Sequence, residues 1–327
     1  MKCTNRIIAN CIVIILLCTT ITGCGSKEYE MAYDRNSSVS SFRFLEEQAE
    51  EAASGFATDL CVTVSTSVSE NDVQIEESAA ALLCDLNKKE IIYGKNQYEQ
   101  MEPASLTKVM TALVALKYGN LDDVYTATSN VEITESGATL VGLKAGDTMT
   151  LEQALHGLLM SSGNDAAVLI AEGISGNVDS FCALMNEEAK KLGATRCNFK
   201  NPHGLTEEGH YVTAYDLYLI FKEAIKYDEF NEIINSANYS TVYKNAEGSS
   251  KELTCESTNL YIKGTYTPPE HVKVIGGKTG TTSSARNCLI LYAKDTAGNP
   301  YVSVILKCSE RGILYEEMTD LLSEIAK

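Results

Sequence analysis

The sequence predicts an α+β domain in which an antiparallel sheet is built from both ends of the domain around a mostly helical insert. Three observations lead to this fold class: a hairpin pattern near residue 80, a central region with apolar residues at helical spacing, and three apolar runs close to the C-terminal end. Strand-like segments on both sides of a helical region imply one sheet assembled from the two ends.

The first expected element is a β-hairpin. The apolar segments Ala79–Cys84 and Glu90–Gly94 flank the turn-like segment Asp85–Lys88. Two short apolar runs on either side of a polar turn are typical of paired antiparallel strands.

The helical insert and the C-terminal strands follow from the spacing of apolar residues. Leucines and other apolar residues recur every three to four positions from Leu106 to Leu116 and from Leu151 to Leu159. Further helices are expected over Ala166–Ala171 and Phe181–Leu192, strands over Val272–Ile275, Cys288–Ala293 and Val302–Leu306, and a closing amphipathic helix over Ile313–Ile325.

The N-terminal end is expected to be an export signal over residues 1–23. Lys2 and Arg6 give it a basic start, and the apolar run Cys11–Cys18 is too short to span a bilayer. Ile21–Cys24 resembles the lipobox of bacterial lipoproteins, in which the cysteine is lipidated and becomes the first mature residue. The alternative is an ordinary secretory signal in which Cys24 is incidental.

Residues 24–77 are rich in Ser, Thr and Glu, and they include the acidic stretch Glu46–Glu51. Such a segment buries little apolar surface. We therefore expect a tether, with a short helix near Phe42–Ala53, that joins the membrane to one globular domain over residues 78–327. That length is enough for one substantial core.

The charge and the cysteines exclude several classes of partner. The chain has a formal net charge of −17, which repels nucleic acid and anionic lipid headgroups. No CxxC pair is present, which argues against a zinc site. Apart from the signal and the candidate lipidation site Cys24, the remaining cysteines are odd in number and scattered. We expect buried free thiols at Cys61, Cys84, Cys182, Cys197, Cys255, Cys288 and Cys308.

Ser105 is the candidate nucleophile. It precedes the helical spacing that begins at Leu106, so it lies near a helix N-terminus, and Lys108 follows one turn later on the same face. A neutral lysine amine can take the proton of a serine hydroxyl when burial or a neighbouring cation such as Lys278 lowers its pKa. Taken alone, Ser-x-x-Lys is also compatible with a capping serine and a solvated lysine.

Ser162 and Asn164 form the second motif, in a loop between two apolar helical stretches. The Ser162 hydroxyl is suited to pass a proton to a leaving amine, and the Asn164 amide to bind the substrate backbone and Lys108. Alone, this Ser-Gly-Asn segment would be interpreted as a helix cap.

Lys278, Thr279 and Thr281 form the third motif, at the end of a strand that begins through two glycines. A substrate lying along this strand would extend the sheet, and the lysine and the two hydroxyls are suited to hold a carboxylate. The backbone N–H groups of Ser105 and Thr281 are the expected oxyanion hole. Alone, the motif would be an ordinary strand end.

The order of the three motifs makes them specific together. The chain resembles the penicillin-binding protein and serine β-lactamase superfamily, and most of all the low-molecular-mass D-alanyl-D-alanine carboxypeptidases. Pro103–Lys108 is similar to the start of the family's nucleophile helix, and Asn201–Leu205 with Thr213 and Asp216 resembles the stretch after the second motif. The resemblance covers about residues 78–327 and implies a β-lactamase/transpeptidase-like fold.

The resemblance implies a reaction and partners. Ser105 would attack the bond between the last two D-alanines of a peptidoglycan stem peptide, D-alanine would leave, and water would hydrolyse the acyl-enzyme. Penicillins and other β-lactams would acylate the same serine. The family needs no metal or organic cofactor. With a lipid at Cys24, the enzyme would act in cell-wall synthesis at the outer face of the cytoplasmic membrane, and nucleic acid is not an expected partner.

Two alternatives stay open. A serine β-lactamase shares the fold and the motifs, but class A enzymes need a Glu some thirty residues past the second motif, and residues 191–205 contain none. A non-catalytic cell-wall-peptide or penicillin-binding protein is the other. The resemblance also suggests Arg311 or Arg286 as a carboxylate ligand, and it leaves His203 either ordering a loop or contacting substrate.

Overall fold

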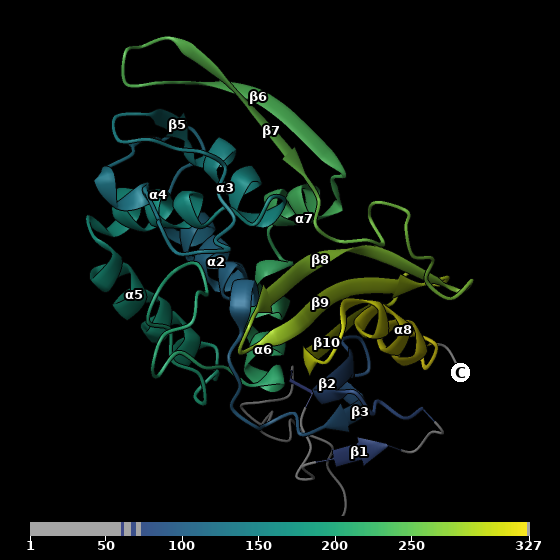
Figure 1. Cartoon of the computed structure of the whole chain (residues 1–327). Coiled ribbons are helices and arrows are strands. Elements are labelled where there is room, and N and C mark those ends of the chain that lie inside the picture. Colours follow the sequence, from purple (N-terminus) through teal and green to yellow (C-terminus); the bar gives the residue numbers. More distant parts are fainter. Residues whose placement is uncertain (1–59, 62–66, 70–72, 326–327) are drawn as a thin grey trace, which may run out of the picture. The chain divides into compact units, whose positions relative to one another are not determined.

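The computed structural model describes residues 60–61, 67–69 and 73–325, which belong to one compact unit within Phe56–Lys327. Its main sheet has six antiparallel strands in the order β1-β3-β2-β10-β9-β8 (Figure 1). Their bounds are β1 Ser67–Ser69, β2 Ser78–Asp85, β3 Glu90–Lys95, β8 Val272–Thr282, β9 Arg286–Asp295 and β10 Pro300–Cys308. The strand order joins the two ends of the domain at the β2–β10 pair. The expected fold class is confirmed.

The expected hairpin is formed by β2 and β3. Its turn closes because the Asp85 carboxylate accepts the backbone N–H groups of Asn87 at 2.9 Å and Lys88 at 2.8 Å. An aspartate that binds the backbone two and three residues later favours a turn over a continued strand.

The sheet has an apolar core on each face. Successive side chains of a strand point to opposite faces, so Leu82 packs with the helical insert while Leu83 packs with the last helix, α8 Arg311–Leu322. Both leucines are fully buried. Figure 1 shows α8 along one face of β9 and β10 and the helical insert on the other side of the sheet.

The insert contains six α-helices, and α2 is surrounded by the others (Figure 1). Nine of the α2 residues from Thr107 to Ala115 are buried, which fits a helix that is apolar on all sides. The helices and short 3-10 turns of the insert are η2 Ala104–Leu106, α2 Thr107–Tyr118, η3 Ser129–Val131, α3 Leu151–Leu159, α4 Asn164–Ser175, α5 Val178–Lys191, α6 Ala214–Ala224 and α7 Asp228–Asn235.

A second sheet was not expected from the sequence. It has the order β4-β5-β6-β7, with β4 Val124–Thr126, β5 Thr148–Thr150, β6 Asn238–Lys244 and β7 Ser250–Glu256. The last two strands form a hairpin that extends over α3 (Figure 1). Its alternating pattern was visible in the sequence, but most of its residues are exposed and polar.

The N-terminal boundary differs from the expected one. Residues within the expected tether already belong to the fold, because β1 pairs with β3 and the backbone N–H of the buried Cys61 donates to the Tyr218 hydroxyl at 3.1 Å. Cys61 is part of the main core cluster and is joined to α6 by hydrogen bonds with Tyr218 and Tyr215. The signal peptide, Cys24 and the expected helix near Phe42–Ala53 lie outside the described residues.

The seven cysteines expected as free thiols are free, and only Cys197 among them is more than slightly exposed.

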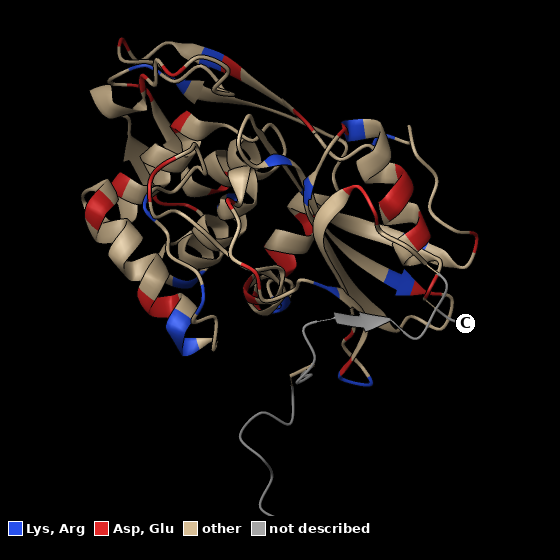
Figure 2. Cartoon of the chain, turned by 60° about the horizontal axis from the view of Figure 1, so that its bottom comes forward, with Lys and Arg blue, Asp and Glu red and all other residues tan. Residues whose placement is uncertain are grey.

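Figure 2 shows acidic and basic residues interspersed along the described helices and loops.

Candidate active site

The candidate nucleophile Ser105 lies in the 3-10 turn η2, directly before α2. The preceding Ala104 has a positive φ of 47°, a strained conformation for a residue with a side chain. The Thr107 hydroxyl donates to the Ala104 carbonyl at 2.9 Å and helps to hold this turn. The residue that follows this strained position, Ser105, lines the active-site cavity.

Lys108 is fully buried, and its Nζ has three partners. It is 3.0 Å from Ser105 Oγ, 2.6 Å from Asn164 Oδ1 and 2.6 Å from the His203 carbonyl oxygen. Two of these partners are carbonyl oxygens, which only accept hydrogen bonds. A neutral amine has two N–H groups and one lone pair, so with both N–H groups given to the carbonyls its lone pair faces the Ser105 hydroxyl.

The surroundings of Lys108 favour the neutral amine. Burial is the largest cause that holds the pKa of Lys108 well below its usual range, and the charge of Lys278 lowers it further, while Asp165 raises it. Burial also lowers the pKa of Lys278, to about 7. The sequence proposed Lys278 as the cation that depresses Lys108, and the structure adds burial as the stronger cause.

The second motif lies at the start of α4. Ser162 has a positive φ of 60° in the loop that precedes the helix, and Asn164 is its first residue. Asp165, which sequence reasoning missed, anchors the facing loop because its carboxylate accepts the backbone N–H groups of Val141, Gly142 and Leu143 at 2.8–3.0 Å. An acidic residue in the first turn of a helix was the available signal.

The third motif lies on β8, an edge strand of the main sheet. Lys278 is fully buried and donates to the Thr279 carbonyl at 2.9 Å. Gly280 packs so closely on η2 that a Cβ there would lie 3.0 Å from the Ser105 nitrogen. Glycine at this position therefore lets the third motif and the nucleophile meet.

A cavity of about 190 Å³ connects the motifs. Ser105, Ser162, Thr279 and Thr281 all line it, whereas Lys108 and Asn164 do not line it and reach it through the hydrogen bond from Lys108 to Ser105. Arg311, from the start of α8, also lines it, and Arg286 does not. Sequence reasoning missed six further lining residues that belong to no motif, namely Thr139, Thr258, Asn287, Cys288, Leu314 and Tyr315.

The segment that follows the second motif, Asn201–Leu205, helps to position Lys108. His203 offers its carbonyl to Lys108, and its Nδ1 accepts the Leu205 N–H at 3.2 Å, so this histidine orders the loop. Gly204 has a φ of +86°, and a Cβ there would lie 1.8 Å from the Ala104 carbonyl oxygen. Burial lowers the pKa of His203 to about 3 and that of His210, which contacts Thr107, to about 4.

No group of three His, Cys, Asp or Glu side chains suited to a metal ion occurs among residues 60–61, 67–69 and 73–325.

The family model for D-alanyl-D-alanine carboxypeptidases, the S11 peptidases, matches residues 65–310. The chain belongs to this family. The family expected from the sequence is thereby confirmed, and the match begins before residue 78, as the fold does.

Individual members of the D-alanyl-D-alanine carboxypeptidase family support the assignment. The chain is 37% identical over 221 residues to DacF of Bacillus subtilis (strain 168), which covers 67% of this chain and 54% of that protein. It is 31% identical over 257 residues to DacC of Escherichia coli (strain K12), which covers 76% and 60%. The chain thus spans somewhat more than half the length of these relatives.

The Streptomyces K15 DD-transpeptidase is a similar solved structure, with a TM-score of 0.71 and 25% sequence identity over 77% of this chain and 98% of that one. The likeness confirms the β-lactamase/transpeptidase-like fold that the resemblance implied.

Proposed function

We propose that this chain is a serine-type D-alanyl-D-alanine carboxypeptidase that removes the terminal D-alanine from peptidoglycan stem peptides through an acyl-enzyme. One observation carries the proposal: a buried lysine whose two N–H groups have carbonyl acceptors and whose third neighbour, at 3.0 Å, is the Ser105 hydroxyl. Membership of the carboxypeptidase family supports the choice of substrate.

Acylation begins with Lys108 as the general base. Ser105 Oγ attacks the carbonyl carbon of the terminal peptide bond while its proton passes to the Lys108 amine. The resulting ammonium has three N–H donors, which match its three neighbours. The site therefore accepts the proton without leaving a new donor unpaired.

The leaving group needs a proton when the C–N bond breaks. We assign this step to Ser162, which lines the same cavity as Ser105. Its hydroxyl gives its proton to the leaving nitrogen and takes one in turn from the Lys108 ammonium, so that Lys108 is neutral again. D-alanine departs as the amine, and the acyl group stays on Ser105 as an ester. Water then attacks the ester with Lys108 again as base, which releases the shortened peptide and restores the serine.

The carboxylate of the substrate is assigned to the opposite wall. Thr279, Thr281 and Arg311 line the cavity there. An arginine with hydroxyl donors beside it suits a carboxylate. The backbone N–H groups of Ser105 and Thr281 are assigned to the oxyanion. The Asn164 side chain, whose oxygen already accepts from Lys108, is assigned to the substrate backbone.

Penicillins are expected to acylate Ser105 and to leave slowly. In class A β-lactamases a glutamate activates the water that hydrolyses the acyl-enzyme. Residues 191–205, where that glutamate would be expected, contain none. The next one, Glu207, is engaged by the Asn201 side-chain amide at 2.9 Å.

The test uses the full chain and two readouts. A fluorescent penicillin should label the wild-type protein and not Ser105→Ala, and the wild type should release D-alanine from a peptide that ends in D-Ala-D-Ala. A folded wild-type protein that takes no label and releases no D-alanine contradicts the proposal, and rapid penicillin hydrolysis would instead support the β-lactamase alternative.

We also propose export and lipid anchoring through Cys24 at the outer face of the cytoplasmic membrane. The pattern Ile21–Cys24 after a short apolar run supports this proposal. Cells grown with labelled palmitate should label the wild type, and Cys24→Ala should remove both the label and the membrane retention. Wild-type protein that carries no lipid would contradict it.

Within the described residues, no single helix has both the length and the apolar composition to cross a bilayer, and the bent pair α4 and α5, at 84°, has them only when taken together.

A further inference from the structure

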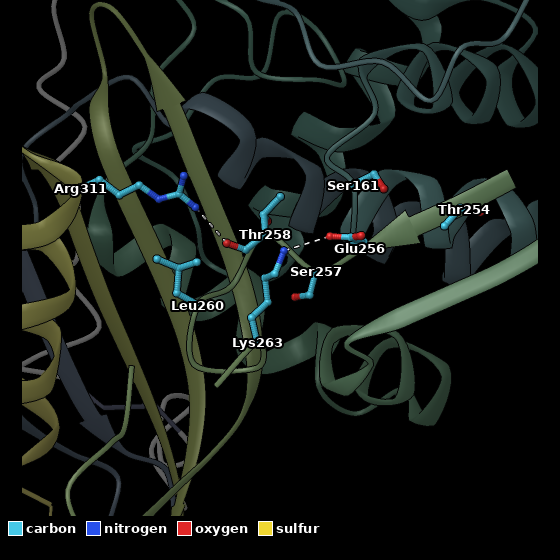
Figure 3. A pocket seen from close by; sticks show the side chains of 8 residues that line it. All are labelled: Ser161, Thr254, Glu256, Ser257, Thr258, Leu260, Lys263 and Arg311. Atoms are coloured by element: carbon cyan, nitrogen blue, oxygen red, sulfur yellow. Dashed lines mark hydrogen bonds and ion pairs between the residues drawn. The ribbon is translucent and has the colours of Figure 1, made fainter. Parts of the chain in front are cut away.

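A second cavity adjoins the active-site cavity. It has a volume of about 440 Å³, and its walls come from the α3–α4 connection, from β7, from the segment that leads to β8 and from the start of α8 (Figure 3). Thr258 and Arg311 line both cavities. These two residues therefore form the boundary between them.

The boundary residues are tied to the third motif. The Arg311 guanidinium donates to the Thr258 carbonyl at 3.4 Å, and the Thr279 hydroxyl donates to the Thr258 hydroxyl at 2.7 Å. The second cavity thus begins at the carboxylate-binding wall of the proposed site. Ser105, which receives the acyl group, lines only the first cavity.

This arrangement fixes which part of a substrate the second cavity faces, given the proposed function on which the inference rests. The residue that leaves carries the free carboxylate held near Thr279 and Arg311. Its α-carbon therefore lies beside the boundary, and its side chain points past Thr258. The second cavity has a volume of about 440 Å³, whereas a single water needs only about 15 Å³. The methyl group of a terminal D-alanine would therefore leave most of the cavity unfilled.

The walls of the second cavity are polar and carry opposite charges. Glu256 and Lys263 form an ion pair at 3.0 Å, with 64% and 40% of their side chains exposed. Figure 3 shows this pair projecting into the cavity from β7 and from the following loop, and Ser161 adds a hydroxyl. When the substrate carboxylate neutralises Arg311, the more exposed charge that remains is the Glu256 carboxylate.

We propose that the second cavity is a pocket for the side chain of the released residue, and that it accepts a long side chain ending in an ammonium group with Glu256 as its counter-ion. Glu256 and Lys263 thereby determine specificity for the leaving residue and take no part in the bond-breaking step.

The test compares three acyl-peptides that differ only in the last residue: D-Ala-D-Ala, D-Ala-D-Lys and D-Ala-D-norleucine. The wild-type full chain should cleave all three, and kcat/KM for D-lysine release should exceed that for D-norleucine by about threefold, the size that an exposed ion pair gives. Glu256→Gln should remove this preference. Lys263→Gln should increase it, because the competing ammonium is gone.

Glu252→Gln is the matched control, since Glu252 lies on the same strand outside the cavity lining. It should keep the wild-type preference. Release of D-alanine without release of D-norleucine or D-lysine overturns the pocket and leaves the proposed function intact, as does equal release of D-lysine and D-norleucine. Folded protein that cleaves none of the three peptides overturns both.

Discussion

Replacing Asn164 by aspartate tests whether Lys108 acts as a neutral base. The change is nearly isosteric, and it places an anion where the amide oxygen now lies 2.6 Å from the Lys108 Nζ. Two opposite charges 4 Å apart attract by about 4 kcal/mol at an effective dielectric constant near 20. Since one pKa unit corresponds to about 1.36 kcal/mol, the pKa of Lys108 should rise by about three units.

The assay is the rate of acylation by a fluorescent penicillin as a function of pH. At or below the wild-type pKa of Lys108, Asn164→Asp should react about a thousandfold more slowly than the wild type, as expected for three pKa units. Between the wild-type pKa and the raised one, the ratio of variant to wild-type rate should rise about tenfold per pH unit. Taking the ratio removes the titration of Lys278, which both proteins share.

Asn164→Ala is the control, because it removes the amide oxygen without adding a charge. It should lower the rate by a factor that changes little with pH. If Asn164→Asp slows acylation by the same factor at every pH, the proton acceptor is not Lys108 and the reasoning fails.

Four further predictions use other parts of the site. Lys108→Arg should abolish penicillin acylation because a guanidinium stays protonated, and an unchanged labelling rate would exclude Lys108 as the base. Because the pKa of Lys278 is lowered to about 7, its charge is lost above that pH, so kcat/KM for a carboxylate substrate should decline there; a flat profile to pH 9 would contradict the role of that charge. Gly204→Ala forces a Cβ to within 1.8 Å of the Ala104 oxygen at a φ of +86°, so the free energy of unfolding should fall by at least about 2 kcal/mol in denaturant titrations, and wild-type stability would disprove the strain. Burial lowers the pKa of His210 to about 4 in the folded state, against 6.5 for an unperturbed histidine, so the unfolded state binds the proton more tightly. The resulting contribution to the free energy of unfolding, about 3 kcal/mol, is present above pH 6.5 and is lost as the pH falls towards 4. A His210→Asn variant should therefore lose less stability than the wild type over that pH range.

The sequence was enough to predict the elements that have a strong local pattern. The hairpin of β2 and β3 and the apolar cores of β9 and β10 all appear where apolar runs and turn residues placed them. Most residues of β2, β9 and β10 are buried, so the apolar composition of these strands reports their environment directly. The third-motif strand is longer than its apolar run indicated, because β8 continues through its glycines to Thr282.

Features that depend on distant contacts could not be predicted in this way. Asp165 resembles any acidic residue in the first turn of a helix until the loop at 141–143 folds onto it. The sequence offered no way to choose between Arg311 and Arg286 as the carboxylate ligand, because the choice depends on where the starts of α8 and β9 lie in space. In the structure, Arg311 lines the active-site cavity and Arg286 does not. Cys61 lay in a segment whose composition indicated a tether, and its hydrogen bonds with Tyr218, Tyr215 and Asp85 assign it to the fold.

The second sheet was missed for a different reason. β6 and β7 are mostly exposed, and a strand exposed on one face shows only a weak alternation of a few apolar residues. The hairpin nevertheless bears on the proposed specificity, since Glu256 at the end of β7 lines the second cavity.

The close approach of Gly280 to the Ser105 nitrogen has a consequence for biogenesis. Residues so distant along the chain meet late, because long-range pairings raise contact order and slow folding. A chain still being synthesised would hold Ser105 long before the strand that completes its surroundings. Antibiotic labelling should thus report the folding of newly made molecules, and a pulse-chase experiment could time that folding in living cells.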